Sequence, residues 1–228
     1  MYLQFITGGS GAGKSEYFTR LVCEESVRRP HDNFIVVVPE QYTMETQKKL
    51  VHMHSRKGIL NIDVVSFERL AYKVFEELGG GNRPVLDDTG KNLIVRRVLE
   101  KEKKKLDYFG SSIEKTGFVS ELKSVISELL QYGITPQQLG EIGENVKEKQ
   151  QLSAKLKDIR LVYEEFMAFL STNYITSEEI LDVLCGLVEK SKLIAGSEII
   201  FDGFTGFTPI QYKLMRLLLV YSKGIKIS

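Results

Sequence analysis

Residues 8–15 of this 228-residue chain, which read GGSGAGKS, restrict the fold more than any other segment. They fit the pattern G-x-x-x-x-G-K-[ST] at every position, between a β-rich run at residues 2–7 and a helical segment at residues 15–29. In such a loop the backbone N–H groups surround phosphate oxygens, and the N-terminus of the following helix adds partial positive charge. The motif therefore predicts a strand, a phosphate-binding loop and a helix in direct succession.

The loop residues have distinct expected roles. Lys14 is placed to contact the β- and γ-phosphates of a nucleotide, and the Ser15 hydroxyl is placed to ligate Mg²⁺. A chance match is the alternative, but the strand before the motif and the helix after it are the context that a phosphate-binding loop requires. We therefore expect an ATP and Mg²⁺ site whose nucleotide-binding residues are Gly8, Gly9, Ser10, Gly11, Ala12, Gly13, Lys14 and Ser15.

Short β-rich runs recur at residues 34–38, 63–66, 198–201 and 224–227. The run at 34–38 is apolar without alternation, as in strands that are buried on both faces of a parallel sheet. Helical segments at residues 43–54 and 209–221 lie between runs. This order predicts an α/β fold with a parallel sheet.

Between residues 85 and 192 the β-rich runs disappear and helical periodicity replaces them. Apolar stripes recur from Phe118 to Leu129 and from Leu152 to Leu170, and residues 135–138 and 176–179 match the capping-box pattern. We expect residues 1–84 and 193–228 to form one α/β domain, interrupted by an all-helical, strand-free insertion at residues 85–192. The last β-rich run reaches the end of the chain, so we expect the chain to be part of a longer protein.

A carboxylate that holds the metal is expected at a strand end beside the loop. Asp202, directly after the run at 198–201, is the best candidate, whereas Asp63 stands at the start of its run, before Val64 and Val65, and Asp32 precedes its run. The alternative for Asp202 is an aspartate that opens a glycine-containing turn. In many motor ATPases a glutamate follows this aspartate and orients the attacking water, but here the position is Gly203. The sequence thus predicts a metal site at Ser15 and Asp202 and argues against rapid hydrolysis.

Two further segments follow β-rich runs, at residues 38–43 and 65–71. They fall where the carboxyl ends of parallel strands place ligands, and their polar and aromatic side chains suit single-stranded nucleic acid. The alternative is turn and cap chemistry, with Ser66 capping a helix that starts at Phe67. The candidate DNA contacts are Glu40, Gln41, Thr43, Ser66, Phe67 and Arg69.

Composition excludes several classes of protein. The chain has 31 basic and 30 acidic residues, a net charge of +1, so it is not covered in basic charge for nucleic acid. Residues 91–105 hold seven lysines and arginines against two glutamates, either a stripe for DNA phosphates or a solvated helix face.

Cys23 and Cys185 form no CxxC pattern, which excludes a disulfide framework and favours a cytoplasmic protein. No apolar run reaches the roughly 18 residues of a membrane span.

The segments GGSGAGKS, VPEQYT, VVSFERLA and FDGFTGFTPIQ, in this order and spacing, resemble the N-terminal region of the AddB (RexB-like) B subunits of ATP-dependent helicase/nucleases. The resemblance covers essentially the whole chain, although the helical middle fits only by its place and composition. It implies a RecA-like P-loop NTPase domain of the superfamily-one helicase type with a helical insertion. It also implies a degraded metal-binding motif at residues 201–209, where Gly203 departs from the active pattern.

The resemblance further implies partners. AddB-like subunits pair with an A subunit that drives translocation, assist the processing of DNA ends and recognise a Chi sequence. Their C-terminal nuclease domain and its iron–sulfur cluster would lie outside this chain. The leading hypothesis is therefore the ATP-binding, helicase-like part of a subunit that acts in DNA double-strand break repair and recombination.

Two alternatives remain from the residues alone. One is a DNA-scanning or scaffold module that binds nucleotide without turnover, which the glycine at position 203 favours. The other is a small-molecule kinase with the helical block as a lid. A kinase lid supplies arginines to the transferred phosphate, and Arg96 and Arg97 are the only close pair in the insertion.

Overall fold

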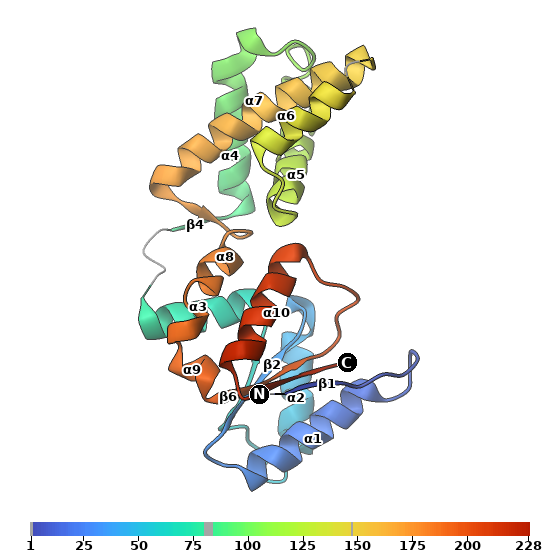
Figure 1. Cartoon of the computed structure of the whole chain (residues 1–228), viewed down its shortest axis with the longest axis vertical. Helices are drawn as coiled ribbons and strands as arrows, with labels where there is room; N and C mark the ends of the chain where they lie inside the picture. Colours follow the sequence, from blue (N-terminus) through green and yellow to red (C-terminus); the bar gives the residue numbers. More distant parts are fainter. Residues whose placement is uncertain (1, 80–83, 147) are drawn as a thin grey trace. The chain divides into compact units, whose positions relative to one another are not determined.

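The computed structural model describes residues 2–79, 84–146 and 148–228. The chain divides into two compact units, an α/β unit (Met1–Gly81 with Leu181–Ser228) and a helical unit (Asn82–Ile180), which Figure 1 shows in cartoon form. No helix among the described residues has both the length and the apolar character that crossing a bilayer requires.

The α/β unit is built on a five-stranded sheet in which all neighbouring strands are parallel. Its spatial order is β1-β7-β6-β2-β3, with bounds β1 (Leu3–Phe5), β2 (Asn33–Val37), β3 (Ile62–Val65), β6 (Ser197–Phe201) and β7 (Gly224–Ile227). The chain leaves β1 at one edge and goes to β2, and the later strands β6 and β7 fill the space between them. The direction of the chain across the sheet reverses after β3, and open α/β sheets with such a reversal bind ligands at the carboxyl ends of their strands. The predicted α/β fold with a parallel sheet is confirmed.

Helices cover both faces of this sheet. They are α1 (Lys14–Arg28), α2 (Thr43–Met53), α3 (Phe67–Leu78), α9 (Lys192–Ala195) and α10 (Pro209–Tyr221), with short 3₁₀ turns η1 (Glu40–Tyr42) and η3 (Val188–Lys190). On one face, Phe18 and Val22 of α1 pack with Phe34 and Val36 of β2 and with Ile200 of β6. On the other face, Phe67 at the start of α3 packs on Phe201, with ring centroids 5.5 Å apart. Burial on both faces explains why the β-rich runs lack alternation.

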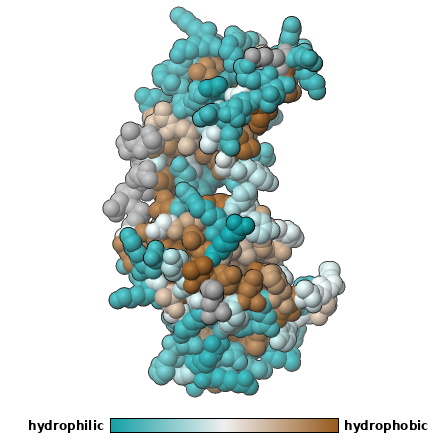
Figure 2. Space-filling model, in the orientation of Figure 1, coloured by the Kyte–Doolittle hydropathy of each residue, from teal (hydrophilic) through white to brown (hydrophobic). Residues whose placement is uncertain are grey.

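β1 is the exception, because all three of its residues are exposed. It pairs only with β7 in the described part of the chain, and Phe5 keeps 62% of its surface exposed. Figure 2 shows that hydrophobic side chains gather around α10 and β1 in this view. The N-terminal strand is therefore an open, apolar edge of the sheet.

The helical unit contains α4 (Asp88–Glu102), η2 (Lys103–Lys105), α5 (Phe118–Gln131), α6 (Pro136–Asn145) and α7 (Gln150–Asn173). Its core joins Leu99 of α4, Ile126 of α5 and Phe166 of α7, all at most 1% exposed. At the start of α6, the Gln138 N–H donates to Thr135 Oγ1 (3.2 Å) while the Thr135 N–H donates to Gln138 Oε1 (2.9 Å). The predicted capping box is thus confirmed, with proline at the first helical positions.

The expectation of a strand-free middle block is wrong. β4 (Val85–Leu86) and β5 (Ile175–Thr176) pair in parallel within the helical unit. Two residues are too few to show a period-2 pattern, so sequence periodicity could not find them. The second expected capping box forms its hydrogen bonds (Glu179 N–H to Thr176 Oγ1, 3.3 Å) around a turn instead, and α8 (Ile180–Cys185) begins only after it.

The boundary between the units also differs from the expected position at residue 192, because the α/β unit already resumes at Leu181. Glu77 at the end of α3 accepts hydrogen bonds from the Ser191 hydroxyl (2.6 Å) and the Lys192 N–H (2.9 Å). The start of α9 is therefore fixed to α3. Helical periodicity identifies a helix but not the core on which it packs, which is why the sequence assigned this segment to the insertion.

Candidate functional site at the carboxyl edge of the sheet

The glycine-rich loop leaves the carboxyl end of β1 and leads directly into α1, as predicted. Gly11 (φ +75°) and Gly13 (φ +81°) have left-handed backbone conformations that other residues rarely adopt, and Gly13 is the N-cap of α1. The Lys14 ammonium donates to the carbonyls of Gly8 (2.9 Å) and Gly9 (3.0 Å). The Lys14 side chain therefore folds back over the glycine-rich loop that precedes it.

Ser15, in the first turn of α1, lies beside Asp202, which directly follows β6. The Ser15 hydroxyl donates to Asp202 Oδ1 at 3.0 Å. The Asp202 N–H donates to the Val37 carbonyl (3.1 Å), so the pairing of β6 with β2 continues up to the aspartate and fixes its backbone. The structure thus brings together the two predicted metal ligands from distant parts of the sequence.

Sequence reasoning missed Ser228, which follows β7 between β1 and β6. Its hydroxyl also donates to Asp202 Oδ1, and its N–H donates to the Phe201 carbonyl at 3.0 Å. Its position after a β-rich run was the available signal, since residues after neighbouring parallel strands meet at one edge.

A pocket of about 290 Å³ lies next to the Ser15–Asp202 pair. On its α2 side, Lys49 Nζ lies 2.6 Å from a Glu45 carboxylate oxygen, and the hydrogen bond from Lys49 lowers the pKa of Glu45. The lining residues are Ser15, Thr19, Val38, Tyr42, Glu45, Thr46, Lys49, Asp202 and Gly203.

Ser15 and Asp202 offer one hydroxyl and one carboxylate, which are hard oxygen ligands. Mg²⁺ prefers such ligands and usually keeps several waters, so one or two protein ligands beside a nucleotide phosphate suit it. The described residues contain no group of three or more His, Cys, Asp or Glu side chains placed to hold a metal by themselves. The donor set therefore fits a metal ion that arrives with a phosphate ligand.

A second pocket, of about 410 Å³, joins the two segments that the sequence singled out for nucleic acid. Residues 38–42, 66–68 and 203–206 and Gln211 line it. Val38, Tyr42 and Gly203 line both pockets, so the two cavities share a wall. The two segments therefore meet at the carboxyl edge of the sheet, as expected from their positions after strands.

The six candidate contacts divide into exposed and buried side chains. Glu40 and Arg69 form an ion pair of 2.9 Å with both side chains 58% exposed, and Gln41 is also exposed. The other three are buried. Ser66 caps α3 by accepting a hydrogen bond from the Arg69 N–H (3.3 Å), and the Thr43 hydroxyl donates to the Glu40 carbonyl (2.9 Å). The cap role that was the alternative for Ser66 is thus present in the structure.

Phe67 belongs to an aromatic cluster that the sequence did not predict. Its ring contacts Phe201 and Phe204, and Phe207 contacts Tyr212 with centroids 5.6 Å apart. Phe67 is only 6% exposed, whereas Tyr212 is 53% exposed. The available signal was the repeated phenylalanine of FDGFTGFTP. Phe204 is partly exposed and lines the second pocket, so it extends the groove wall beyond the predicted residues.

The basic segment at residues 91–105 is largely neutralised by neighbours. Lys91 is buried and bonds Glu178 (2.8 Å), Lys101 bonds Glu165 (2.5 Å) and Lys103 bonds Glu114 (3.1 Å). Arg96 pairs with Glu100 at 3.3 Å, and the Arg97 guanidinium lies 5.7 Å from the centroid of the Phe169 ring. These pairings favour an ordinary helix face over a stripe for DNA phosphates.

The fold and site define a class of protein, parallel α/β domains with a glycine-rich loop after the first strand and a carboxylate after an inner strand. A family model described as "ADDB, N-terminal" matches residues 5–228, and the chain belongs to this family. The resemblance inferred from the motifs is therefore confirmed.

Among its relatives, the chain is 49% identical over 228 residues to the B subunit of the ATP-dependent helicase/deoxyribonuclease of Lachnoclostridium phytofermentans. It is 37% identical to the protein with that description from Caldanaerobacter subterraneus, and 36% identical to the one from Clostridium kluyveri. Each match covers 100% of this chain but 20% of the relative. The chain thus spans about a fifth of the length of these curated relatives.

Proposed function

We propose that this chain is the ATP-binding, helicase-like N-terminal part of the B subunit of an ATP-dependent DNA helicase/nuclease that acts in double-strand break repair and recombination. The observation that carries the proposal is the hydrogen bond, at 3.0 Å, from Ser15, the residue after Lys14, to Asp202. It joins a phosphate-binding motif to a metal-binding carboxylate in a chain whose relatives are described as ATP-dependent.

At this site each residue has one role. The backbone N–H groups of residues 8–15 and the N-terminus of α1 hold the nucleotide phosphates. Lys14 exchanges the Gly8 and Gly9 carbonyls for the terminal phosphates, and Ser15 and Asp202 hold Mg²⁺. When bound, Mg²⁺ would neutralise part of the negative charge of the phosphates.

The groove of the second pocket is the proposed path for a single DNA strand. Gln41 and Arg69 have exposed side chains that can reach backbone phosphates or base edges, with Glu40 orienting Arg69 through their ion pair. Ser66 and Phe67 line the groove and are buried, whereas Thr43 is buried and is not part of the lining. The A subunit and a specific DNA sequence are the partners that family membership suggests.

ATP binding without rapid turnover is the proposed mode of action. Gly203 has φ +79°, a conformation that L-residues rarely adopt, so this backbone disfavours a glutamate at that position. The kinase alternative gains no support, because Arg96 and Arg97 are engaged within the helical unit.

Equilibrium ATP binding to the wild-type chain and to Lys14→Ala tests the proposal. Saturable binding that the substitution abolishes is the expected result. Equal binding by both proteins would contradict the assignment of the loop.

A further inference from the structure

Helix α1 is attached to strand β6 at both of its ends. At its N-terminus Ser15 bonds Asp202, and just after its C-terminus Arg29 Nη2 donates to Glu198 Oε2 at 2.7 Å. Glu198 lies near the start of β6, and Asp202 directly follows its end. The second attachment lies far from the pocket and has no part in the function proposed above.

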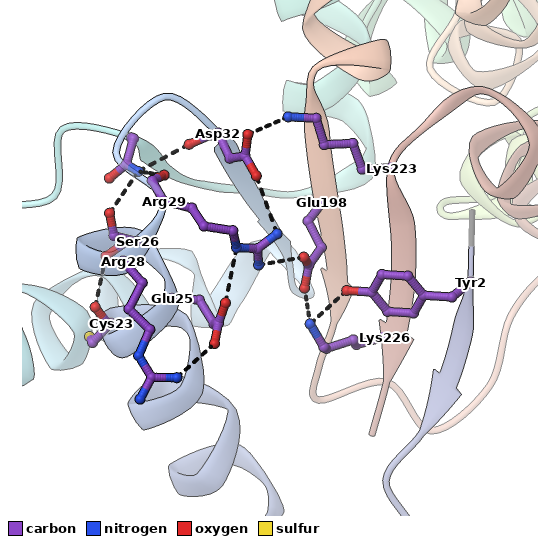
Figure 3. Close-up of polar contacts among 11 residues, drawn as sticks. Tyr2, Cys23, Glu25, Ser26, Arg28, Arg29, Asp32, Glu198, Lys223 and Lys226 are labelled. Carbon is purple, nitrogen blue, oxygen red and sulfur yellow. Dashed lines mark hydrogen bonds and ion pairs between the residues drawn. The ribbon is translucent and has the colours of Figure 1, made fainter.

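Arg29 is the centre of a polar cluster (Figure 3). Its guanidinium donates to three carboxylates through three different nitrogens. Besides Glu198, these are Glu25 in α1 (Nε, 2.9 Å) and Asp32 in the connection to β2 (Nη1, 3.2 Å). A planar guanidinium satisfied in this way has a fixed position, unlike a lysine ammonium.

Glu198 is held as firmly as Arg29. It is 1% exposed, and its other carboxylate oxygen accepts a hydrogen bond from Lys226 of β7. Lys226 also donates to the Tyr2 hydroxyl at 2.8 Å, next to β1. Burial, and then the nearby Arg29 guanidinium, lower the pKa of Lys226. The carboxylate is therefore a fixed anchor shared by two inner strands.

We propose that the Arg29–Glu198 ion pair sets the position of α1 along β6 and thereby the separation of Ser15 from Asp202. Arg29 is then a positioning residue for the metal side of the nucleotide site. This inference rests on the proposed function. The physical reason is that a helix and a strand are each stiff, so a displacement of the C-terminal end of α1 along β6 also moves its N-terminal end, where Ser15 lies.

The phosphate side of the site does not depend on this pair. The Lys14 ammonium bonds carbonyls only six and five positions earlier in the chain, within the loop itself. A shift of α1 along β6 would carry the loop contacts of Lys14 with it but would change the Ser15–Asp202 contact. Mg²⁺-dependent and Mg²⁺-free nucleotide binding should therefore respond differently to loss of Arg29.

The test compares Arg29→Gln with Arg28→Gln. Arg28 is the matched control, because it bonds the same Glu25 (3.4 Å) but has a 70% exposed side chain, and among the described residues it forms no ion pair with β6. ATP affinity is measured with Mg²⁺ and with EDTA, and folding is checked by circular dichroism. We expect Arg29→Gln to lose roughly 10-fold of the Mg²⁺-dependent gain in affinity, the scale of lost positioning partners at metal sites. Its affinity in EDTA and both affinities of Arg28→Gln should stay at wild-type values.

Arg29→Lys is the second variant, since it keeps the charge and the fold but loses the three-way geometry. An intermediate loss of the Mg²⁺ effect is expected for it. A wild-type Mg²⁺ effect in folded Arg29→Gln and Arg29→Lys would overturn the inference. An equal loss of ATP affinity with Mg²⁺ and with EDTA, or failure of both variants to fold, would show that Arg29 acts on stability. Either result would also overturn the inference. If the wild-type chain binds no ATP in either condition, the proposed function itself has failed.

Discussion

Ser15 and Asp202 are 187 positions apart in the sequence, yet the hydroxyl of one donates to the carboxylate of the other at 3.0 Å. The sheet order explains this contact. β1 and β6 are separated only by β7, and all three strands are parallel, so the segments that follow them meet at one edge. The helical unit is inserted between β3 and β6 without disturbing that arrangement.

Lys14→Ala should abolish the stabilisation of the chain by ATP and leave the stability of the free protein unchanged. In the described part of the chain the Lys14 ammonium donates to two exposed backbone carbonyls, so its loss removes no buried hydrogen bond. ATP at 100 times its Kd should stabilise the wild type by about 2.7 kcal/mol and the variant by none. Thermal unfolding with and without ATP·Mg²⁺ measures both effects.

Lys49→Ala is the control for this comparison, because Lys49 is 61% exposed and lies across the pocket on α2, paired with Glu45. It should keep most of the ATP effect. Equal protection of wild type and Lys14→Ala would contradict the loop assignment.

Gly203→Ala should destabilise the chain by about 1 kcal/mol, the cost of a left-handed conformation for a residue with a Cβ. The nearest atoms to such a Cβ, in Pro39 and Tyr42, lie at ordinary contact distances, so the backbone angle alone is responsible. Gly206→Ala is the matched control, since Gly206 has no positive φ and open space around it. Urea unfolding of the two variants gives the difference, and equal stabilities would show that φ at position 203 does not matter.

Arg69→Ala should weaken single-stranded DNA binding and reduce the salt slope of log K by about 0.7, the value for one phosphate contact. Arg20→Ala is the control, because Arg20 is comparably exposed in an ion pair with Glu16 on α1, whereas Arg69 pairs with Glu40, which lines the second pocket. Fluorescence anisotropy with a labelled oligonucleotide at several salt concentrations measures both quantities. A loss of affinity with an unchanged slope would mean that Arg69 contacts no phosphate.

Tyr163 should make the helical unit sensitive to alkali. Burial, followed by the charge of Glu179, raises the pKa of Tyr163 to about 12, and its hydroxyl donates to the Ile134 carbonyl at 3.0 Å. A raised pKa gives stability that is fully present below the unfolded value of 10.0 and is lost as pH rises towards 12.

Tyr163→Phe should therefore flatten the fall in unfolding free energy between these pH values, at a cost of about 1 kcal/mol at neutral pH for the lost hydrogen bond. Urea unfolding across the alkaline range measures the effect. An unchanged slope would contradict the assignment.

The parts of the fold predicted from sequence were those with strong local signals. The helix expected at residues 209–221 has those bounds in α10, because proline stands at its start and Thr208 forms a capping box with Gln211. The Ser15–Asp202 contact was predictable because the glycine-rich motif identifies Ser15. In a parallel sheet, the metal-binding carboxylate is then expected after a strand that ends at the same edge. Thr43, Ser66 and Phe67 were proposed as contacts from residue type and from their position after a strand, and neither signal can distinguish a buried cap from an exposed ligand.

The parts that sequence could not supply depend on tertiary packing. The β4–β5 pair is too short to carry a pattern. The assignment of residues 181–192 to the α/β unit depends on the bonds of Glu77 with Ser191 and Lys192. The Arg29–Glu198 pair depends on the burial of Glu198 in β6, which the sequence pattern does not indicate.

The central claim is that ATP binds without rapid turnover, and steady-state ATP hydrolysis with and without single-stranded DNA tests it most directly. Loss of a water-positioning group typically costs on the order of 10²- to 10⁴-fold in rate. The chain, and the full-length B subunit assayed alone, should therefore bind ATP yet hydrolyse it barely above background in both conditions. Brisk hydrolysis that DNA stimulates and Lys14→Ala abolishes would contradict this account.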